Sequence, residues 1–393
     1  MQAGLTFDEA FSLATDVRNA LSETDRITPE ALREVVTRQL RDQHDQSIVE
    51  TYCAPTIAPS RILITGRNGS ENHFSRARLE RFLQASGLRV GDSEMITDMI
   101  HESLLSKGVD RLSTDALAML IFACLSEEKS SKVARRFLLW LEFTRSERPL
   151  LLLVGGAVGS GKSTLATELA HRLEISRVQS TDMLREVMRT MIPRQLLPVL
   201  HVSSYEAWNT LPIDEGEART ADMLVADGFR SQAQLLEVSC LAVMGRACRE
   251  GVSLILEGVH ALPGLLERNS WSEHPVCVHL TLAVLHTGTL KKRLRVRGVD
   301  APGRRVEDQL ECFESIWALQ SFLLDEADQC ASAVISNEDF ETTVREAALT
   351  IIRTLGHQFE GTLESALGSE AGEFDAYIGR ESWRLLLPRL IAK

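Results

Sequence analysis

Residues 149–162, PLLLLVGGAVGSGK, decide the fold that we expect for this chain. The apolar run predicts a buried strand, the glycines predict a tight turn, and TLATELAHRL from Thr164 onward predicts a helix. Four further apolar runs, at 175–180, 252–258, 275–284 and 332–337, predict more strands with helices between them. Because parallel strands need long, usually helical crossovers, this alternation predicts an α/β domain over residues 146–357, with helices on both faces of a parallel sheet.

The glycine turn matches the phosphate-binding pattern G-x-x-x-x-G-K-S. Glycines let backbone N–H groups point inward at phosphate oxygens, and the next helix adds its positive end. We expect Lys162 to offset charge on the β- and γ-phosphates of ATP, and the Ser163 hydroxyl to ligate Mg²⁺. The alternative, a chance glycine turn before Lys-Ser, is disfavoured by the strand-loop-helix context. The expected nucleotide contacts are Gly156, Ala157, Val158, Gly159, Ser160, Gly161, Lys162, Ser163 and Thr164.

An acidic residue and two arginines follow the second predicted strand. Asp182 comes just after it, and Arg185 and Arg189 lie one helical turn apart. The carboxyl ends of parallel strands border the ligand crevice, so Asp182 could orient an acceptor hydroxyl or accept its proton. Arg185 and Arg189 could bind a carboxylate or phosphate. The alternative is a helix-capping aspartate followed by surface arginines.

Glu257 ends the apolar run SLIL and precedes Gly258-Val259-His260. An acid at this place can hold Mg²⁺ through a water, as a Walker B acid does. It could instead cap the next helix or solvate the turn. His260 is a weaker candidate for substrate binding, because a lone histidine is more often a structural hydrogen-bonding residue.

KKRLRVRG at 291–298 and GRR at 303–305 form the densest basic region of the chain. Arg293 and Arg297 share a helical face and could close over the phosphoryl group during transfer, stabilising its charge. The alternative is a solvated basic helix. The aromatic residues of SSYEAWNTL, at 203–211, are expected to pack in the core, with a substrate-pocket wall as the alternative.

Composition restricts the class of protein. The 393 residues include 43 Lys and Arg against 55 Asp and Glu, a formal net charge of −12, which disfavours non-specific binding to nucleic acid. No apolar run approaches the roughly 18 residues of a membrane span, and the start MQAGLTFDEAFS lacks a secretory pattern, so we expect a cytoplasmic protein. Seven scattered cysteines support neither a disulfide framework nor a zinc site. The oligomeric state stays open.

The remaining sequence is expected to be mostly helical. Residues 14–40 resemble residues 96–125, since both run from an apolar-periodic helix through a turn to helix-start residues, Thr28-Pro29-Glu30 and Ser113-Thr114-Asp115. Two unrelated helical hairpins are the alternative. One strand is expected at 60–66. We therefore divide this part into a partial repeat at 1–55 and a domain at 56–145, and treat 358–393 as an acidic linker and tail whose last apolar cluster packs on the main domain.

Three motifs resemble the 2-phosphoglycerate kinase family: GGAVGSGKSTLATELAHRLEISRVQSTDMLREVMR, SSYEAW and LILEGVHALPG. The likeness covers about 145–357. The preceding GRNGSENHFSRARLERFLQASGLRVGDSEMITDMIHESLLSKG resembles an ATP-cone, a small regulatory nucleotide-binding domain. That likeness implies a P-loop NTPase sheet after a cone-like domain at 56–145, which either binds a regulatory nucleotide or serves only for docking.

The resemblance implies transfer of the ATP γ-phosphoryl to the 3-hydroxyl of 2-phosphoglycerate, giving 2,3-bisphosphoglycerate. The residues carried over by the motifs are Lys162, Ser163, Asp182, Arg185, Glu257 and His260, with the arginines of 291–298 resting on weaker local similarity. Two alternatives stay open: a kinase acting on another phosphorylated polyol or sugar acid, such as an inositol phosphate, and a non-catalytic nucleotide-sensing regulator. Both keep the phosphate loop, so turnover without a protein partner distinguishes enzyme from regulator.

Overall fold

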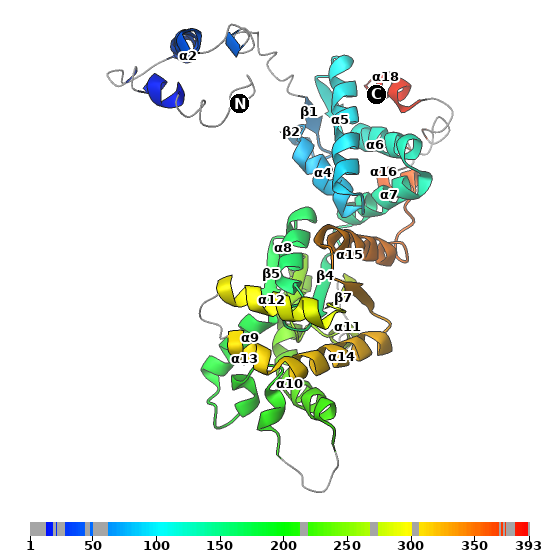
Figure 1. Cartoon of the computed structure of the whole chain (residues 1–393). Coiled ribbons are helices and arrows are strands. Elements are labelled where there is room, and N and C mark those ends of the chain that lie inside the picture. Colours follow the sequence, from blue (N-terminus) through cyan, green and yellow to red (C-terminus); the bar gives the residue numbers. More distant parts are fainter. Residues whose placement is uncertain are drawn as a thin grey trace. The chain divides into compact units, whose positions relative to one another are not determined.

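The computed structural model describes residues 13–18, 21, 28–43, 48–49, 62–212, 219–267, 274–300, 306–368, 371, 374 and 382–391. These residues form two compact units, one running up to Phe74 together with Gly108–Leu112, the other comprising Ser75–Lys107 and the residues from Ser113 onward (Figure 1). The domain boundaries drawn from the sequence stay predictions.

The first unit contains helix α2 (Pro29–Gln43) and most of a small sheet with strand order β2-β1-β3. Strand β1 (Leu63–Thr65) lies within the run expected to be a strand, and it pairs antiparallel with β2 (Glu71–His73); β3 is Arg111–Ser113. Of the first copy of the suggested repeat, the structure describes residues 13–18 and α2 as helical, and residues 22–27 lie outside the described residues.

The second unit begins with four helices, α4 (Arg76–Ala85), α5 (Val90–Ser106), α6 (Thr114–Glu128) and α7 (Ser131–Arg145). The Ser113 hydroxyl accepts a hydrogen bond from the Ala116 backbone N–H at 3.1 Å, so it caps α6 as its sequence position suggests.

A five-stranded parallel sheet forms the rest of this unit, with strand order β5-β6-β4-β7-β8. The strands are β4 (Leu150–Gly156), β5 (Arg177–Ser180), β6 (Leu254–Glu257), β7 (Val276–Ala283) and β8 (Ala333–Ser336). The helices between and after them are α8 (Lys162–Arg172), α9 (Thr181–Met191), α10 (Ala221–Arg249), α11 (Gly264–Glu267), α12 (Thr287–Asp300), α13 (Val306–Glu311), α14 (Phe313–Gln329) and α15 (Phe340–Leu355), with short 3₁₀ turns η1 (Pro198–His201) and η2 (Ala207–Thr210). Each predicted strand of the α/β domain is confirmed.

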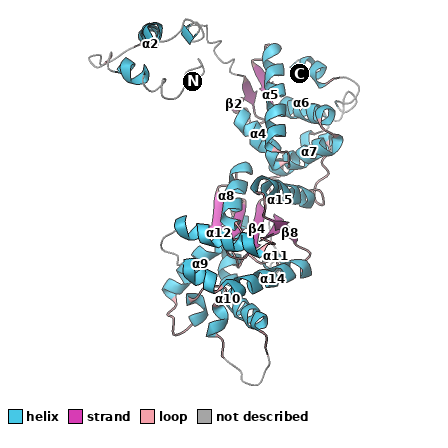
Figure 2. Cartoon of the chain, in the orientation of Figure 1, coloured by secondary structure: helices cyan, strands magenta, loops and turns pink. Residues whose placement is uncertain are grey.

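Strand β4 explains why the sheet carries helices on both faces (Figure 2). Its seven residues are all buried, and successive side chains point to opposite faces. Leu150, Leu152 and Val154 pack with residues of α7, α8 and α15, whereas Leu151 and Leu153 pack with residues of α10 and α11. A strand covered on both faces needs an uninterrupted apolar run, which is what the sequence offers.

The chain after α15 returns to the helices at the start of the unit. We expected its last apolar cluster to pack on the main α/β domain, but helix α18 (Trp383–Ile391) packs on α6 (Figure 1). The Trp383 backbone N–H donates to Glu127 Oε2 at 2.8 Å and its indole Nε1 donates to Glu128 Oε1 at 3.2 Å. Two carboxylates at the end of α6 thus fix this tryptophan, which is 1% exposed. The short helix α16 (Leu363–Leu367) packs likewise on α7.

Trp383→Ala is expected to release α18 from α6. Removing a buried tryptophan side chain costs about 3–5 kcal/mol, and here the Glu128 carboxylate also loses the indole N–H that donates to it. Urea unfolding and limited proteolysis should show a lower free energy of unfolding and faster cleavage after residue 368. Leu385→Ala is the control, because Leu385 lies on the same helix with 60% of its surface exposed. Equal protease resistance of the two variants would contradict this docking.

Two expectations from composition, on membrane spans and on cysteines, can be compared with the described residues. None of their helices combines the length and hydropathy needed to cross a membrane. The six cysteines among them form no disulfide, and burial raises the pKa of Cys124 and of Cys240 to about 12. These two thiols are therefore protonated at neutral pH and behave as small apolar core residues.

Candidate active site

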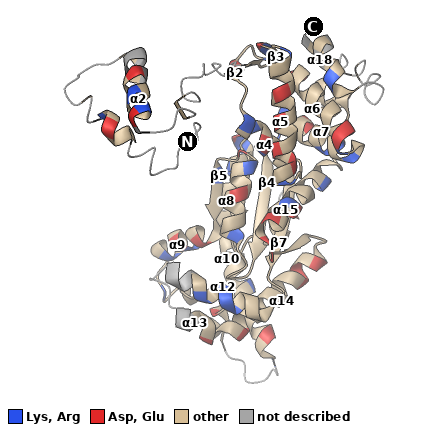
Figure 3. Cartoon of the chain, turned by 45° about the horizontal axis from the view of Figure 1, so that its top comes forward, with Lys and Arg blue, Asp and Glu red and all other residues tan. Residues whose placement is uncertain are grey.

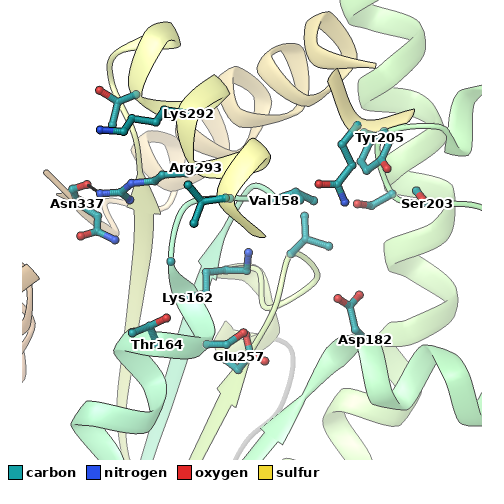
Figure 4. A pocket seen from close by; sticks show the side chains of 18 of the residues that line it. Val158, Lys162, Thr164, Asp182, Ser203, Tyr205, Glu257, Lys292, Arg293 and Asn337 are labelled. Carbon is teal, nitrogen blue, oxygen red and sulfur yellow. Dashed lines mark hydrogen bonds between the residues drawn. The ribbon is translucent and has the colours of Figure 1, made fainter. Parts of the chain in front are cut away.

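A cleft of about 780 Å³ lies where the strands of the parallel sheet end (Figure 4). Its wall combines the glycine loop after β4, the start of α9, residues 203–205, the end of β6, the side of α12 and the first residues after β8. Six chain segments meet here, and four of them lie at the ends of β4, β5, β6 and β8, because parallel strands all end at the same edge. The sequence placed its candidate residues at this edge for the same reason.

The glycine loop has the backbone shape of an anion cradle. Gly156 and Gly161 have φ angles of 135° and 95°, which glycine alone adopts readily, and an added Cβ at Gly156 would lie 2.3 Å from the Leu282 carbonyl oxygen. The loop then leads into the N-terminus of α8. Six of the nine predicted nucleotide contacts line the cleft, namely Val158, Gly159, Gly161, Lys162, Ser163 and Thr164, while Gly156, Ala157 and Ser160 lie buried beneath it.

Lys162 and Ser163 occupy the first turn of α8. The Lys162 ammonium donates a hydrogen bond to the Ala157 carbonyl oxygen at 2.8 Å, so it lies across its own loop. Ser163 Oγ donates to Glu257 Oε2 at 3.1 Å, and Glu257, the last residue of β6, is 7% exposed. A hydroxyl and a carboxylate brought this close at a phosphate loop fit the oxygen ligands that Mg²⁺ prefers.

Asp182 and Arg185 form the opposite wall of the cleft. The Asp182 side chain is 56% exposed and faces the same space as Lys162 (Figure 4). Arg185 is 18% exposed; its Nη1 donates to the Val202 carbonyl oxygen at 2.5 Å, and its Nη2 lies 3.8 Å from Asp182 Oδ1. Arg189, one turn further along α9, pairs with Glu186 at 2.9 Å and does not line the cleft.

His260 lies beneath this wall and is not one of the residues that line the cleft. It is 2% exposed, its ring stacks on Phe229, and its Nε2 lies 2.8 Å from Gln232 Oε1. Burial lowers the pKa of His260 to about 3, against the opposing effect of the Asp182 carboxylate, so the imidazole is neutral. This placement does not favour the direct substrate contact predicted from the sequence.

Helix α12 carries several Lys and Arg residues (Figure 3), and Lys292 and Arg293 on it line the cleft. Arg293 Nη1 donates to the Ser160 carbonyl oxygen at 3.4 Å, and its Nη2 donates to the Asn337 carbonyl oxygen at 2.6 Å. Arg293 therefore joins α12 both to the phosphate loop and to the end of β8. The side chain of Arg297 and residues 303–305 lie outside the described residues.

Asn337 and Lys292 are two of the cleft residues that were not predicted individually from the sequence. Asn337 directly follows β8, is 5% exposed, and donates from Nδ2 to the Ser160 carbonyl oxygen at 2.8 Å. Its place at the end of an apolar run was a signal that could have found it. Lys292, beside Arg293, lines the cleft as a second cation. Tyr205 both packs in the core and lines the cleft, so the two interpretations of its segment are compatible.

Comparison with known proteins shows to which family the chain belongs. A 2-phosphoglycerate kinase from Methanopyrus kandleri is 36% identical over 275 residues, which cover 70% of this chain and 82% of the relative. The chain belongs to the 2-phosphoglycerate kinase family. Family members from Thermococcus kodakarensis and Methanocaldococcus jannaschii are 33% and 32% identical, covering 72% and 78% of this chain and 93% and 98% of their own lengths. No family model matches the chain.

Proposed function

We propose that this member of the 2-phosphoglycerate kinase family transfers the γ-phosphoryl group of ATP to the 3-hydroxyl of 2-phosphoglycerate, giving 2,3-bisphosphoglycerate. The observation that carries the proposal is that one cleft holds a phosphate loop with Lys162 on one side and Asp182 with Arg185 on the other. A kinase must hold donor and acceptor in this way, since most of its rate enhancement comes from positioning and electrostatics.

On the donor side, the loop N–H groups and the Lys162 ammonium bind the phosphates of ATP. Arg293, held against the loop, adds positive charge where the transferred group loses its bond to ADP. Ser163 and Glu257 are the residues that would hold Mg²⁺, which neutralises phosphate charge when bound. Arg297 stays a predicted contributor on the same helix.

On the acceptor side, Asp182 accepts a hydrogen bond from the attacking hydroxyl and takes its proton as the new O–P bond forms. Arg185 binds a phosphate or carboxylate oxygen of the acceptor, because a guanidinium forms charge-assisted hydrogen bonds with those groups. Arg189 lies outside the cleft, paired with Glu186, and we assign it no direct contact.

The alternatives left open by the sequence concern the acceptor and catalysis itself. An inositol phosphate or another phosphorylated sugar acid would use the same donor side, and a nucleotide-sensing regulator would keep the loop without turnover. The family membership favours 2-phosphoglycerate, and no observation favours either alternative. A regulatory nucleotide at residues 56–145 is a further proposal that rests on the cone-like sequence. A cytoplasmic location is another, which rests on the sequence pattern of apolar runs and of the first residues.

The test is incubation of the purified protein with Mg-ATP and one acceptor at a time. The acceptors are 2-phosphoglycerate, 3-phosphoglycerate, glycerate and inositol phosphates, and ³¹P NMR identifies each product. We expect 2,3-bisphosphoglycerate from 2-phosphoglycerate alone. Preferential phosphorylation of an inositol phosphate would show that this compound, and not 2-phosphoglycerate, is the acceptor. ATP binding without any product would favour a nucleotide-sensing regulator.

Glu257→Gln is expected to raise the Mg²⁺ concentration for half-maximal activity by about tenfold to a hundredfold, as for loss of a residue that orients a metal's ligands. The amide keeps the shape and the contact with Ser163 but loses the negative charge. Activity measured against Mg²⁺ concentration at saturating ATP checks this. Glu314→Gln, at an exposed position in the first turn of α14, removes an equal charge and should leave the Mg²⁺ requirement as in the wild type. An unchanged requirement in Glu257→Gln would remove this residue from the metal site.

A further inference from the structure

A buried glutamine on α10 connects three parts of the acceptor side. Gln232 is fully buried, and its Nε2 donates to the Val199 and Val202 carbonyl oxygens at 2.5 Å and 3.2 Å. Its Oε1 lies 2.8 Å from His260 Nε2. An amide in the middle of a helix, with both ends hydrogen-bonded to other segments, ties those segments together.

These contacts fix the protonation of the histidine. Two carbonyl oxygens need a donor, so the amide nitrogen of Gln232 must face them and Oε1 must face His260. His260 Nε2 therefore carries the proton and donates it to Oε1. His260 Nδ1 is the bare nitrogen, buried and without a hydrogen-bond partner among the described residues. A neutral ring agrees with the burial that lowers the pKa of this histidine to about 3.

The same network reaches Arg185 through one shared acceptor. The Val202 carbonyl oxygen accepts from Gln232 Nε2 and also from Arg185 Nη1, the latter at 2.5 Å. With Nη1 held in this way, Arg185 Nε has no hydrogen-bond partner among the described residues, and Nη2 is 3.8 Å from Asp182. Because Nε is buried and Nη1 is bound to the Val202 carbonyl, Nη2 is the guanidinium nitrogen left for an oxyanion in the cleft that Arg185 lines.

The segment after Val202 belongs to the cleft wall. Ser203, Ser204 and Tyr205 follow directly and line the cleft beside Asp182. A displacement of the Val202 carbonyl would shift these residues together with Arg185. The contacts described above for Lys162, Arg293 and Asn337 at the phosphate loop go to the Ala157, Ser160 and Asn337 carbonyl oxygens and to no residue of this network.

We propose that Gln232 and His260 are positioning residues for the acceptor: through the Val202 carbonyl they hold the Val199–Tyr205 segment and the oxyanion-binding Nη2 of Arg185 in place. The inference rests on the proposed function in one respect, namely that Arg185 binds the acceptor. Neither positioning residue lines the cleft, so both act through Val202 and Arg185.

Gln232→Met tests the inference with a side chain of similar length that can make none of the three hydrogen bonds. We expect the KM for 2-phosphoglycerate to rise by about tenfold to a hundredfold, since small displacements of a positioning group cost that much. The Kd for ATP, measured by calorimetry, should change less than about twofold because the donor contacts are untouched. Gln232→Leu is the second variant: it also removes all three hydrogen bonds, with a branched apolar side chain, and should show the same selective rise.

Gln320→Met is the matched control. Gln320 on α14 is also buried, and its amide also bonds two backbone groups, donating to the Val284 carbonyl and accepting from the Val284 N–H, both at 3.0 Å. Its loss should lower thermal stability about as much as the loss of Gln232 but leave both the KM for 2-phosphoglycerate and the Kd for ATP near their wild-type values. Equal changes for acceptor and ATP in Gln232→Met would reduce the glutamine to a general core residue and overturn the inference.

A spectroscopic measurement separates this inference from the proposed function. In ¹⁵N-histidine-labelled wild-type protein, with His260 assigned by comparison with His260→Gln, we expect the Nε2-protonated neutral tautomer. An Nδ1-protonated or charged ring would overturn the network whatever the activity. If the wild type fails to phosphorylate 2-phosphoglycerate, the proposed function fails instead. If the wild type phosphorylates 2-phosphoglycerate but Gln232→Met leaves the KM for 2-phosphoglycerate unchanged, the positioning role is wrong while the proposed function stands.

Discussion

Lys162→Ala is expected to lower kcat for phosphoryl transfer by about a thousandfold, the scale seen when a group that stabilises transition-state charge is removed. The ammonium of Lys162 is the cation of the phosphate loop itself, and negative charge shifts toward it as the bond to ADP breaks. Single-turnover kinetics with Mg-ATP and 2-phosphoglycerate measure the effect on the chemical step. Thermal unfolding shows whether loss of the contact with the Ala157 carbonyl also weakens the fold.

Lys291→Ala is the control for Lys162. It lies on α12 with its ammonium over the Phe313 ring, 4.1 Å from the centroid, and it does not line the cleft. It should retain nearly full activity, because it removes the same charge from the protein without touching the loop. More than a tenth of wild-type kcat in Lys162→Ala would mean that transfer does not take place at this loop.

Asp182→Asn should lower kcat by about 10²–10⁴-fold, the usual contribution of a general base. Asparagine keeps the size of the side chain but cannot take the proton of the attacking hydroxyl. The KM for ATP should stay near its wild-type value, since Asp182 lies on the wall opposite the phosphate loop. Steady-state kinetics with each substrate varied in turn separate these two effects.

Glu186→Gln controls for a lost carboxylate on the same helix. Glu186 lies one turn beyond Asp182 and pairs with Arg189 outside the cleft, so activity should be close to that of the wild type. If Asp182→Asn instead raised the acceptor KM with kcat preserved, Asp182 would be a binding residue and another group would have to receive the proton.

The α/β part of this fold was predictable because its signals are local. Each strand is a short apolar run, and the strongest, β4, is buried on both faces. The loop that follows depends on glycines at fixed spacing, and the positions of Asp182 and Glu257 follow from the rule that parallel strands end at the ligand edge. Those residues needed no knowledge of long-range packing.

The residues that escaped prediction depend on contacts between distant segments. Gln232 looks like any polar residue within a long helix, and its importance comes from three partners some thirty positions away on either side. His260 is part of a motif, yet only the fold shows that its ring is buried. The strands β2 and β3 are three residues long, too short for a period of two to emerge.

The docking of Trp383 on α6 also sets an order of events during synthesis. The Trp383 backbone N–H donates a hydrogen bond to Glu127, which lies 256 positions earlier in the chain and is synthesised first. At the usual rate of translation, about 10–50 s separate the two residues, far longer than a helix takes to form. The residues of α6 that receive the tryptophan are therefore made well before their occupant, and α6 has to form without this contact.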